Sequence, residues 1–380
     1  MFRFFVTCAR GTEGALRREI AGMRIAGAKG DHGGVWFEGP LEMGMRVCLH
    51  ARVAVRVLLQ LGTFAAADAQ GLYAGARTIA WRDWLTTKSA FAVHASVRDT
   101  PALTHSGFVA LKVKDAIADA LRDALGARPD VDTKSPDVAV VLHLAAGKAG
   151  IFLDLAAEPL HRRGYRVAMV DAPLKETLAA AVLLLGGAHG DAPFIDPMCG
   201  SGTLAIEHAL AARGIAPGLR RRFGFERWPT LPPEALAAWD RLRAESDQAA
   251  REAIRETWPP IVCADVDGKA LAAARQNAAA ASVDDAIVFE QADVATLERR
   301  WPVATLATNP PYGERLKPAE LEATYRAMGR AFERLAGWRV IVLSGNPAIE
   351  RAIRRKPSVS HRLWNGPLEA RLLRYDMDGR

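Results

Sequence analysis

The feature that most constrains the fold is the stretch from residue 194 to residue 210, which reads FIDPMCGSGTLAIEHAL. A short apolar run ends there at Asp196, and a turn that contains Gly200 and Gly202 follows it. From Thr203 onward the sequence is rich in alanine and leucine, as helices are. We therefore predict a strand, a tight turn and a helix, the arrangement that opens a nucleotide-binding, doubly wound sheet.

A second constraint lies about a hundred residues further along, in the sequence TLATNPPYGERL at residues 305–316. An apolar strand is predicted to end here at Asn309-Pro310-Pro311-Tyr312. Together the two stretches resemble the class I S-adenosylmethionine-dependent methyltransferases, in the branch that methylates exocyclic or amide nitrogens. The resemblance implies an α/β fold with a seven-stranded Rossmann-like sheet, mostly parallel, that ends in an antiparallel hairpin.

The composition bounds the number of domains and the kind of partner. With 380 residues, half of them apolar, the chain suits two or three domains with a sizeable core. A net charge of +7 and a pI near 9.4 fit a polyanionic partner such as RNA, and they also fit a mildly basic enzyme. The cysteines have no CxxC spacing, which argues against a zinc or iron–sulfur site and for a reducing compartment: Cys8, Cys48, Cys199 and Cys263.

No membrane segment is expected. The opening residues MFRFFV are followed at once by charged residues and lack the layout of a signal peptide. The longest apolar run, at residues 178–185, is too short to span a bilayer. We expect a cytoplasmic protein without a membrane partner and without a metal, and we expect a monomer.

Three consecutive units are expected along the chain. Residues 1–55 form a small α+β unit, and residues 56–160 form a second one that ends in a β-hairpin. The second unit resembles the THUMP domain, an RNA-binding module of RNA methyltransferases and thiouridine synthases. With it, residues 1–55 would form the usual pair of a ferredoxin-like domain and THUMP. Residues 161–380 would be the methyltransferase domain, with residues 161–190 as its linker and first helix.

The periodicity of apolar residues predicts the individual elements. In the first two units we expect a hairpin turn at Gly147-Lys148-Ala149-Gly150, strands at residues 3–8, 34–38, 53–62, 91–97, 138–145 and 150–155, and helices at 12–23, 41–51 and 108–125. In the third we expect a hairpin turn at Asn365-Gly366, strands at 261–265, 287–290, 304–308, 339–344, 360–363 and 368–375, and helices at 171–185, 268–281 and 319–335.

Two basic stretches are candidates for RNA contact. The sequence HRRGYR supplies Arg162, Arg163, Tyr165 and Arg166, and arginines can bind phosphates while a tyrosine stacks on a base. The competing interpretation is a solvated basic turn with Tyr165 packed against its domain.

The second basic stretch lies in a long insertion at residues 211–260, where a short loop is usual. It contains Arg221 and Arg222 among aromatic residues, followed by an amphipathic helix at residues 235–256. Basic residues interleaved with aromatics suit RNA contact or a lid, and we expect RNA contact for the arginine loop. For the helix we expect packing of Trp239 and Leu242 on the methyltransferase sheet.

The resemblance also implies a set of cofactor-binding residues. Asp196 would bind the ammonium group of S-adenosylmethionine, and the loop residues would let the backbone approach it: Pro197, Cys199, Gly200, Gly202 and Thr203. Asp265, with Asp267 as a competing candidate, would accept from the ribose hydroxyls, and Asp293 from the adenine amino group. For a lone aspartate after a strand the alternative is a helix cap, but acids after three successive strands favour the cofactor.

The motif at residues 309–312 suggests how a poorly nucleophilic amine could be methylated. The Asn309 amide oxygen and the Pro310 carbonyl would accept its two N–H groups, and Pro311 would help to hold that carbonyl rigid. Tyr312 would stack on an extruded base. Neither acceptor can take a proton, so we expect direct in-line transfer with proton loss to water afterwards, and S-adenosyl-L-homocysteine as the product.

Taken together, the motifs resemble the THUMP-containing guanine-N2 methyltransferases of ribosomal RNA, in particular of bacterial 23S rRNA. One alternative is a tRNA guanine-N2 methyltransferase, and others are a DNA adenine-N6 or protein glutamine-N5 methyltransferase. A non-enzymatic RNA-binding protein is the remaining class. Because this chain ends after one methyltransferase domain, we do not expect it to carry the second activity of longer, fused relatives.

Overall fold

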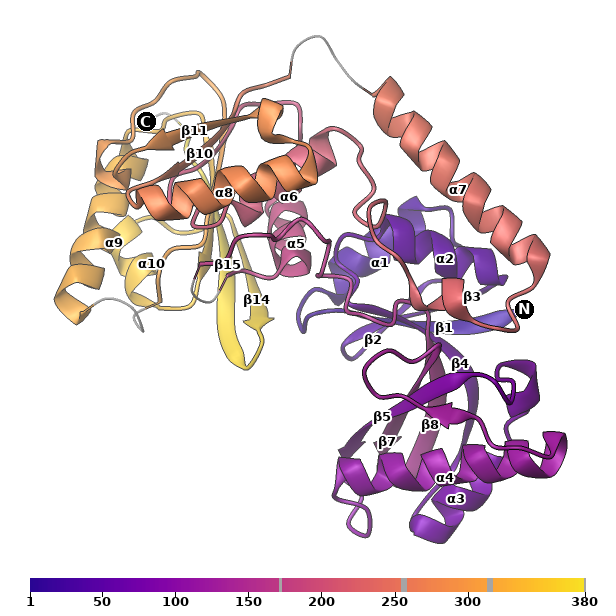
Figure 1. The fold of residues 1–380 in the computed structure, drawn as a ribbon. Helices are drawn as coiled ribbons and strands as arrows, with labels where there is room; N and C mark the ends of the chain where they lie inside the picture. Colours follow the sequence, from indigo (N-terminus) through magenta and orange to yellow (C-terminus); the bar gives the residue numbers. More distant parts are fainter. Residues whose placement is uncertain (171–172, 254–257, 313–316, 379–380) are drawn as a thin grey trace.

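The computed structural model describes residues 1–170, 173–253, 258–312 and 317–378 (Figure 1). The predicted helix start at residues 171–172, the last predicted turn of the helix at 235–256, and residues 313–316 of the second motif lie outside these ranges. Within the described residues the strands form two sheets, one in each half of the chain.

The first sheet crosses the boundary expected after residue 55. Strand β1 (Phe2–Thr7) pairs antiparallel with β3 (Gly34–Gly39) on one side and with β4 (Arg56–Ala65) on the other. The ferredoxin-like and THUMP units are therefore joined into one continuous sheet of order β2-β3-β1-β4-β8-β7-β5-β6. Its other strands are β2 (Lys29–Asp31), β5 (Ala90–Arg98), β6 (Asp130–Val131), β7 (Val138–Ala145) and β8 (Lys148–Asp154).

Helices cover this sheet through apolar faces of helical spacing. In α4 (Ser106–Leu125) the predicted face is buried at Val109, Val113, Ile117 and Leu121. The other helices are α1 (Glu13–Gly22), α2 (Leu41–His50) and α3 (Ala69–Arg77).

The β7–β8 turn is tighter than predicted. It consists of Ala146 and Gly147, both with positive φ (47° and 72°), which suits a two-residue hairpin turn. Lys148 and Gly150, which we expected in the turn, already belong to β8.

The second sheet has the order β11-β10-β9-β12-β13-β15-β14, and the predicted seven-stranded sheet with a C-terminal antiparallel hairpin is confirmed. Strand β9 (Phe194–Asp196) lies between β10 (Ile261–Asp265) and β12 (Thr305–Thr308) and runs parallel to both. The carboxyl ends of these strands therefore meet at one edge, where ligands bind in such sheets. The remaining strands are β11 (Ile287–Gln291), β13 (Arg339–Ser344), β14 (Val359–Asn365) and β15 (Leu368–Asp376), the last antiparallel to β13.

The helices of the second half include one that does not pack on its own sheet. Helix α7 (Pro233–Glu252), from the long insertion, contacts α2 and buries Trp239 in the hydrophobic core of the N-terminal half. Packing was predicted for this helix, but against the methyltransferase sheet, so its location is a correction. The others are α5 (Glu176–Gly186), α6 (Thr203–Ala212), α8 (Gly268–Ala281), α9 (Pro318–Glu333) and α10 (Ala348–Ile353).

Candidate active site

The loop after β9 folds as a tight turn that depends on two glycines. Gly200 and Gly202 have φ values of +54° and +83°, a region that glycine enters without steric strain. A Cβ on Gly202 would lie 3.0 Å from the Cβ of Ala274 in α8, so helix and loop are in close contact. The Gly200 N–H donates to Asp265 Oδ2 (2.8 Å), which joins the loop to the end of β10.

Asp196, at the end of β9, is buried with 1% of its surface exposed. Its Oδ1 accepts from the Met198 N–H (3.2 Å), and the Thr308 hydroxyl lies beside the carboxyl group. Burial, and secondarily the nearby Asp265, raises the pKa of Asp196 from 3.8 to about 8. The carboxyl group is therefore protonated at neutral pH until a cation comes close enough to favour its ionised form.

The other predicted acids lie at the same edge with different partners. Asp265 Oδ1 accepts from the Asp267 N–H (3.0 Å), in addition to its bond from Gly200. Asp267 caps α8 through the Lys269 N–H (2.8 Å), and Asp293 caps a short 3₁₀ turn at Val294–Thr296. Asp265 thus binds the glycine loop, whereas Asp267 and Asp293 each use their side chain to cap the helical turn that follows them. Their ligand roles stay predictions.

The motif after β12 is held from two sides. Asn309 Oδ1 accepts a hydrogen bond from the Tyr312 hydroxyl. The hydroxyl of Tyr325 in α9 donates to the Pro311 carbonyl (2.6 Å), and Asn346 Nδ2 donates to the Tyr312 carbonyl (3.4 Å).

The Tyr312 ring lies directly against the backbone of Gly345, where an added Cβ would be 2.6 Å from the ring. Sequence reasoning missed Tyr325, Gly345 and Asn346. The available signal for the last two was the polar Ser-Gly-Asn that follows the apolar strand β13 at the same sheet edge.

Arg163 and Tyr165, predicted as RNA contacts, are buried, so that prediction is wrong in this structure. Their side chains meet Glu207 of α6: Arg163 Nε lies 3.4 Å from Glu207 Oε1, and the Tyr165 hydroxyl donates to the same oxygen (3.1 Å). Arg163 also donates to the carbonyls of Leu160 and Arg52. A guanidinium that is buried beside a carboxylate is not accessible to a phosphate, and the packed Tyr165 matches the competing interpretation.

Arg166 binds the glycine loop and the start of α6 instead of projecting into solvent. Its guanidinium donates to the hydroxyls of Ser201 (3.0 Å) and Thr203 (3.1 Å) and pairs with Glu176 of α5 (2.8 Å). Arg162, in contrast, is exposed and pairs with Glu158 (3.3 Å).

A residue that the sequence analysis did not single out anchors the same segment. Asn277 of α8 is fully buried, and its Oδ1 accepts from the N–H groups of Val167 and Ala168 (both 2.9 Å). Its Nδ2 donates to the carbonyls of Ala168 (3.0 Å) and Ser201 (3.2 Å). We call residues 163–170 the linker strap, because Arg166 and Asn277 tie this segment to the glycine loop.

In the second pair of predicted RNA-binding arginines, Arg221 and Arg222, one side chain is again buried and the other exposed. Arg221 is buried and donates to the carbonyls of Glu158, Pro159 and Arg162 at 2.9–3.0 Å, so its predicted RNA contact is also corrected. Arg222 is exposed and pairs with Glu226 (3.0 Å). Of the predicted RNA contacts, Arg162 and Arg222 therefore stay accessible.

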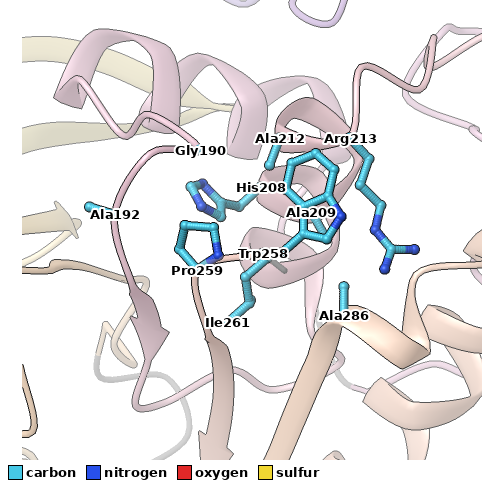
Figure 2. Close-up of a pocket in the computed structure, with 10 residues that line it drawn as sticks. All are labelled: Gly190, Ala192, His208, Ala209, Ala212, Arg213, Trp258, Pro259, Ile261 and Ala286. Carbon is cyan, nitrogen blue, oxygen red and sulfur yellow. The ribbon is translucent and has the colours of Figure 1, made fainter. Parts of the chain in front are cut away.

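A small cavity lies near the opposite ends of the strands (Figure 2). Its volume is about 10 Å³, room for roughly one water molecule. His208, which lines it, stacks on Phe194 with ring centroids 4.1 Å apart, and burial lowers its pKa to about 4. The imidazole is therefore neutral, and this cavity does not compete with the strand edge as a binding site.

Two further features are absent from the part of the chain that the structure describes. It contains no cluster of three histidine, cysteine or acidic side chains that could hold a metal ion. None of its helices is both long and apolar enough to cross a membrane.

The parallel sheet, its glycine loop after β9 and the Asn-Pro-Pro-Tyr loop after β12 define a class I methyltransferase architecture. The family model described as "RMKL-like, methyltransferase domain" matches residues 163–374. A THUMP domain model matches residues 66–154, and an RlmL ferredoxin-like domain model matches residues 3–58. The chain belongs to the family of RMKL-like methyltransferases, and the predicted family resemblance is confirmed.

Similar proteins extend this assignment. The ribosomal RNA large subunit methyltransferase K/L of Aeromonas hydrophila is 40% identical over 99% of this chain and 54% of its own length. The chain spans about half the length of the curated relatives it matches.

Two solved structures are also similar over nearly their whole length. The structure described as "SMU.472, a putative methyltransferase complexed with SAH" has a TM-score of 0.90 and 29% identity over 100% of this chain and 98% of its own. A Listeria monocytogenes protein described as a predicted N6-adenine-specific DNA methylase has a TM-score of 0.88 and 31% identity over 98% and 96%.

Proposed function

We propose that this chain methylates the exocyclic N2 of a guanine in 23S ribosomal RNA, with S-adenosylmethionine as the methyl donor. The observation that carries the proposal is the juxtaposition of two loops at one sheet edge, the glycine loop after β9 and the Asn309 loop after the adjacent strand β12. The THUMP match and the name of the Aeromonas relative support an RNA substrate from the large ribosomal subunit.

The residues around the glycine loop fit the cofactor. Gly200 and Gly202 both have positive φ values, which disfavour a Cβ, so the loop stays narrow and its backbone can approach a ligand closely. Asp196 can neutralise an ammonium group, and Asp265 retains lone pairs for ribose hydroxyls. When bound, S-adenosylmethionine supplies a methyl group on a positively charged sulfur.

The Asn309 loop prepares the acceptor amine. A guanine N2 lone pair is delocalised into the ring, so the two N–H groups must be held while the nitrogen pyramidalises. Asn309 Oδ1 and the Pro310 carbonyl would accept them. Although Oδ1 already accepts from the Tyr312 hydroxyl, an amide oxygen has a second lone pair for the substrate.

The same loop can support the extruded base and the positive charge that develops on the nitrogen. One face of the Tyr312 ring lies on Gly345, and the opposite face would stack against the base. Pro310 and Pro311 keep the acceptor carbonyl rigid, so little reorganisation is needed in the transition state. Neither acceptor is basic enough to keep a proton, so water takes it after the transfer.

The direct test replaces Asn309 by alanine. We expect kcat for methyl transfer to a 23S rRNA transcript to fall by about 10²–10³-fold, the usual loss when one preorganised polar group is removed from a reacting centre. Cofactor affinity measured by calorimetry should stay as in the wild-type protein. Unchanged turnover in N309A would remove the mechanism.

The substrate alternatives are separated by product analysis. The wild-type protein is incubated with 23S rRNA fragments, tRNA and duplex DNA, and nucleosides are identified by mass spectrometry. N2-methylguanosine in rRNA supports the proposal, and the same product in tRNA supports the tRNA alternative. N6-methyladenine in DNA would agree instead with the name of the Listeria structure. A glutamine-containing peptide tests the protein alternative, which its methylation would support. If calorimetry finds no heat of cofactor binding, the chain is a non-enzymatic RNA-binding protein.

A further inference from the structure

The C-terminal hairpin extends beyond the edge of the sheet at which the active site lies. The last residue of β13 to pair with β15 is Ser344, which is opposite Arg371. The hairpin continues past this level, with Trp364 opposite Glu369 and Asn365 opposite Leu368. In Figure 1 the yellow hairpin projects past the other strands of its sheet.

The position of Trp364 relative to the catalytic loop follows from the register. Asn309 follows Thr308, which pairs with Val342, so Trp364 lies about 10 Å further along the strand direction. Three strand spacings separate β12 from β14, which is about 14 Å sideways. The hairpin tip therefore lies on the active-site side of the sheet, roughly 17 Å from the Asn309 backbone, which is a span of a few nucleotides.

An arginine of the N-terminal domain is held against this tip. The Arg10 guanidinium lies 4.0 Å above the centre of the Trp364 ring, and the backbone N–H of Trp364 donates to the Arg10 carbonyl (3.2 Å). At the adjacent Gly11 an added Cβ would lie 2.3 Å from the Arg362 carbonyl oxygen. The loop at residues 10–11 and the hairpin backbone are thus in direct contact.

The charge of Arg10 is not neutralised by the part of the chain described here. Its side chain is exposed and makes no ion pair or hydrogen bond with any described residue. Arg362 is also exposed, but it pairs with Glu369 (3.0 Å). The contact with the indole holds the guanidinium in place, and its N–H donors, which have no partner among the described residues, are available to bind an anion.

We propose that Arg10, stacked on Trp364, binds a backbone phosphate of the RNA strand beside the target nucleotide. This inference rests on the proposed function, because it takes the partner to be RNA. A fixed, unpaired guanidinium suits a phosphate oxygen pair, and its place at the edge of the active site suits the nucleotides next to the flipped base. The contact carries no base specificity and sets the register of the strand.

The test compares Arg10→Ala with Arg241→Ala in binding to a 23S rRNA fragment without cofactor. Arg241 is a matched control, because it is exposed on α7, far from the hairpin in Figure 1, and has no partner among the described residues. For R10A we expect a Kd about 5- to 10-fold higher at 0.15 M salt, and a slope of log K against log salt that is smaller by about 0.7–1. R241A should match the wild-type protein.

Further measurements show whether a loss of RNA binding in R10A comes from the lost phosphate contact, from a folding defect or from a change in the methyl-transfer chemistry. Arg10→Lys keeps the charge, so it should restore the salt slope, and all variants should keep the wild-type thermal transition and cofactor affinity. Any of three results would overturn the inference. The first is an R10A protein with wild-type Kd and salt slope, the second is an equal loss of affinity in R10A and R241A, and the third is an R10K protein whose salt slope does not recover. Because binding is measured without methylation, a failed methylation assay leaves this result interpretable.

Discussion

At the scale of single residues, Gly345 determines where the Tyr312 ring can lie. A Cβ at this position would come within 2.6–2.9 Å of three carbons of the Tyr312 ring. Because the Cβ is fixed to the backbone of residue 345, it cannot rotate away from the ring. In Gly345→Ala the ring must move, and the Asn309 amide then loses the hydroxyl that orients it. We expect kcat to fall about tenfold or more, with unchanged cofactor affinity.

The measurement for this prediction is steady-state kinetics beside calorimetric cofactor binding. Gly14→Ala is the matched control, since nothing lies within 4 Å of a Cβ there. If G345A keeps wild-type kcat, the contact between Gly345 and Tyr312 has no role in turnover.

The buried Asp196 predicts a proton linkage. Because the pKa of Asp196 in the folded protein is about 8, above its ordinary 3.8, the folded state holds a proton that the unfolded state releases near pH 4. Its contribution to the free energy of unfolding is therefore full below pH 4 and is lost as the pH rises through 8. A bound ammonium group favours the ionised carboxylate, so cofactor binding at pH 6.5 should release about one proton.

Calorimetry in two buffers of different protonation enthalpy measures that proton. The observed binding heats should differ by the buffer enthalpies for the wild-type protein, and they should agree for Asp196→Asn. Equal heats for the wild-type protein would show that Asp196 is already ionised or does not meet the cofactor.

At the scale of elements, the linker strap supports the glycine loop through α8. Asn277 uses both donors and two acceptor positions on strap and loop, and it is fully buried. Replacement by aspartate puts a carboxylate oxygen where the Asn277 NH₂ group now donates to the carbonyls of Ala168 and Ser201. Two hydrogen bonds are lost, and the new oxygen faces two carbonyl oxygens. We expect the cofactor Kd to rise about 10- to 100-fold, which corresponds to one or two lost buried hydrogen bonds.

Gln276→Glu on the same helix provides the control for this variant. Residue 276 is exposed, and the substitution makes the same amide-to-carboxylate change one position away. Calorimetry should find wild-type cofactor affinity in Q276E, whereas an N277D protein with wild-type affinity would exclude a supporting role of the strap.

At the scale of the whole molecule, buried charges join the two halves of the chain. Arg163 and Glu207 have side-chain exposures of 3% and 0%. Arg52 of the N-terminal half donates to the carbonyl of Ile215 (2.7 Å), beyond the end of α6. Its neighbour Val53 donates to Glu19 of α1 (2.9 Å).

Removing one charge from this group leaves another without compensation. Glu207→Gln should lower the free energy of unfolding by about 3–5 kcal/mol, because the Arg163 charge then stays buried without its partner. Urea denaturation measures this, with Glu322→Gln of the exposed Glu322–Arg326 pair as a control that should change by at most about 0.5 kcal/mol. A loss in E207Q as small as in the control would contradict the role of the pair.

Much of the fold was predictable because its signals are local. The periodicity around Val109–Leu121, the strand at residues 339–344 and the glycine turn after Asp196 depend on residues close in sequence, and the corresponding elements are confirmed. The β7–β8 turn was misplaced because the apolar periodicity does not show which of several small residues takes a positive φ.

The site was predictable at its motifs but not in their support. Asn309 and Asp196 stand directly after strands, a position that sequence reveals. Asn277 lies inside a helix of ordinary composition, and only its distance from residues 167 and 201 in space makes it a partner of both.

The sequence by itself determined the class of this protein, because the strand–turn–helix at residues 194–210 and the loop at 309–312 carry their meaning in adjacent residues. Only the tertiary structure decided which arginines face solvent. Arg163 and Arg221 are as basic as Arg162 and Arg222, but they meet Glu207 and backbone carbonyls contributed by distant segments. Burial depends on such contacts between remote parts of the chain, and a linear pattern of charges does not encode them.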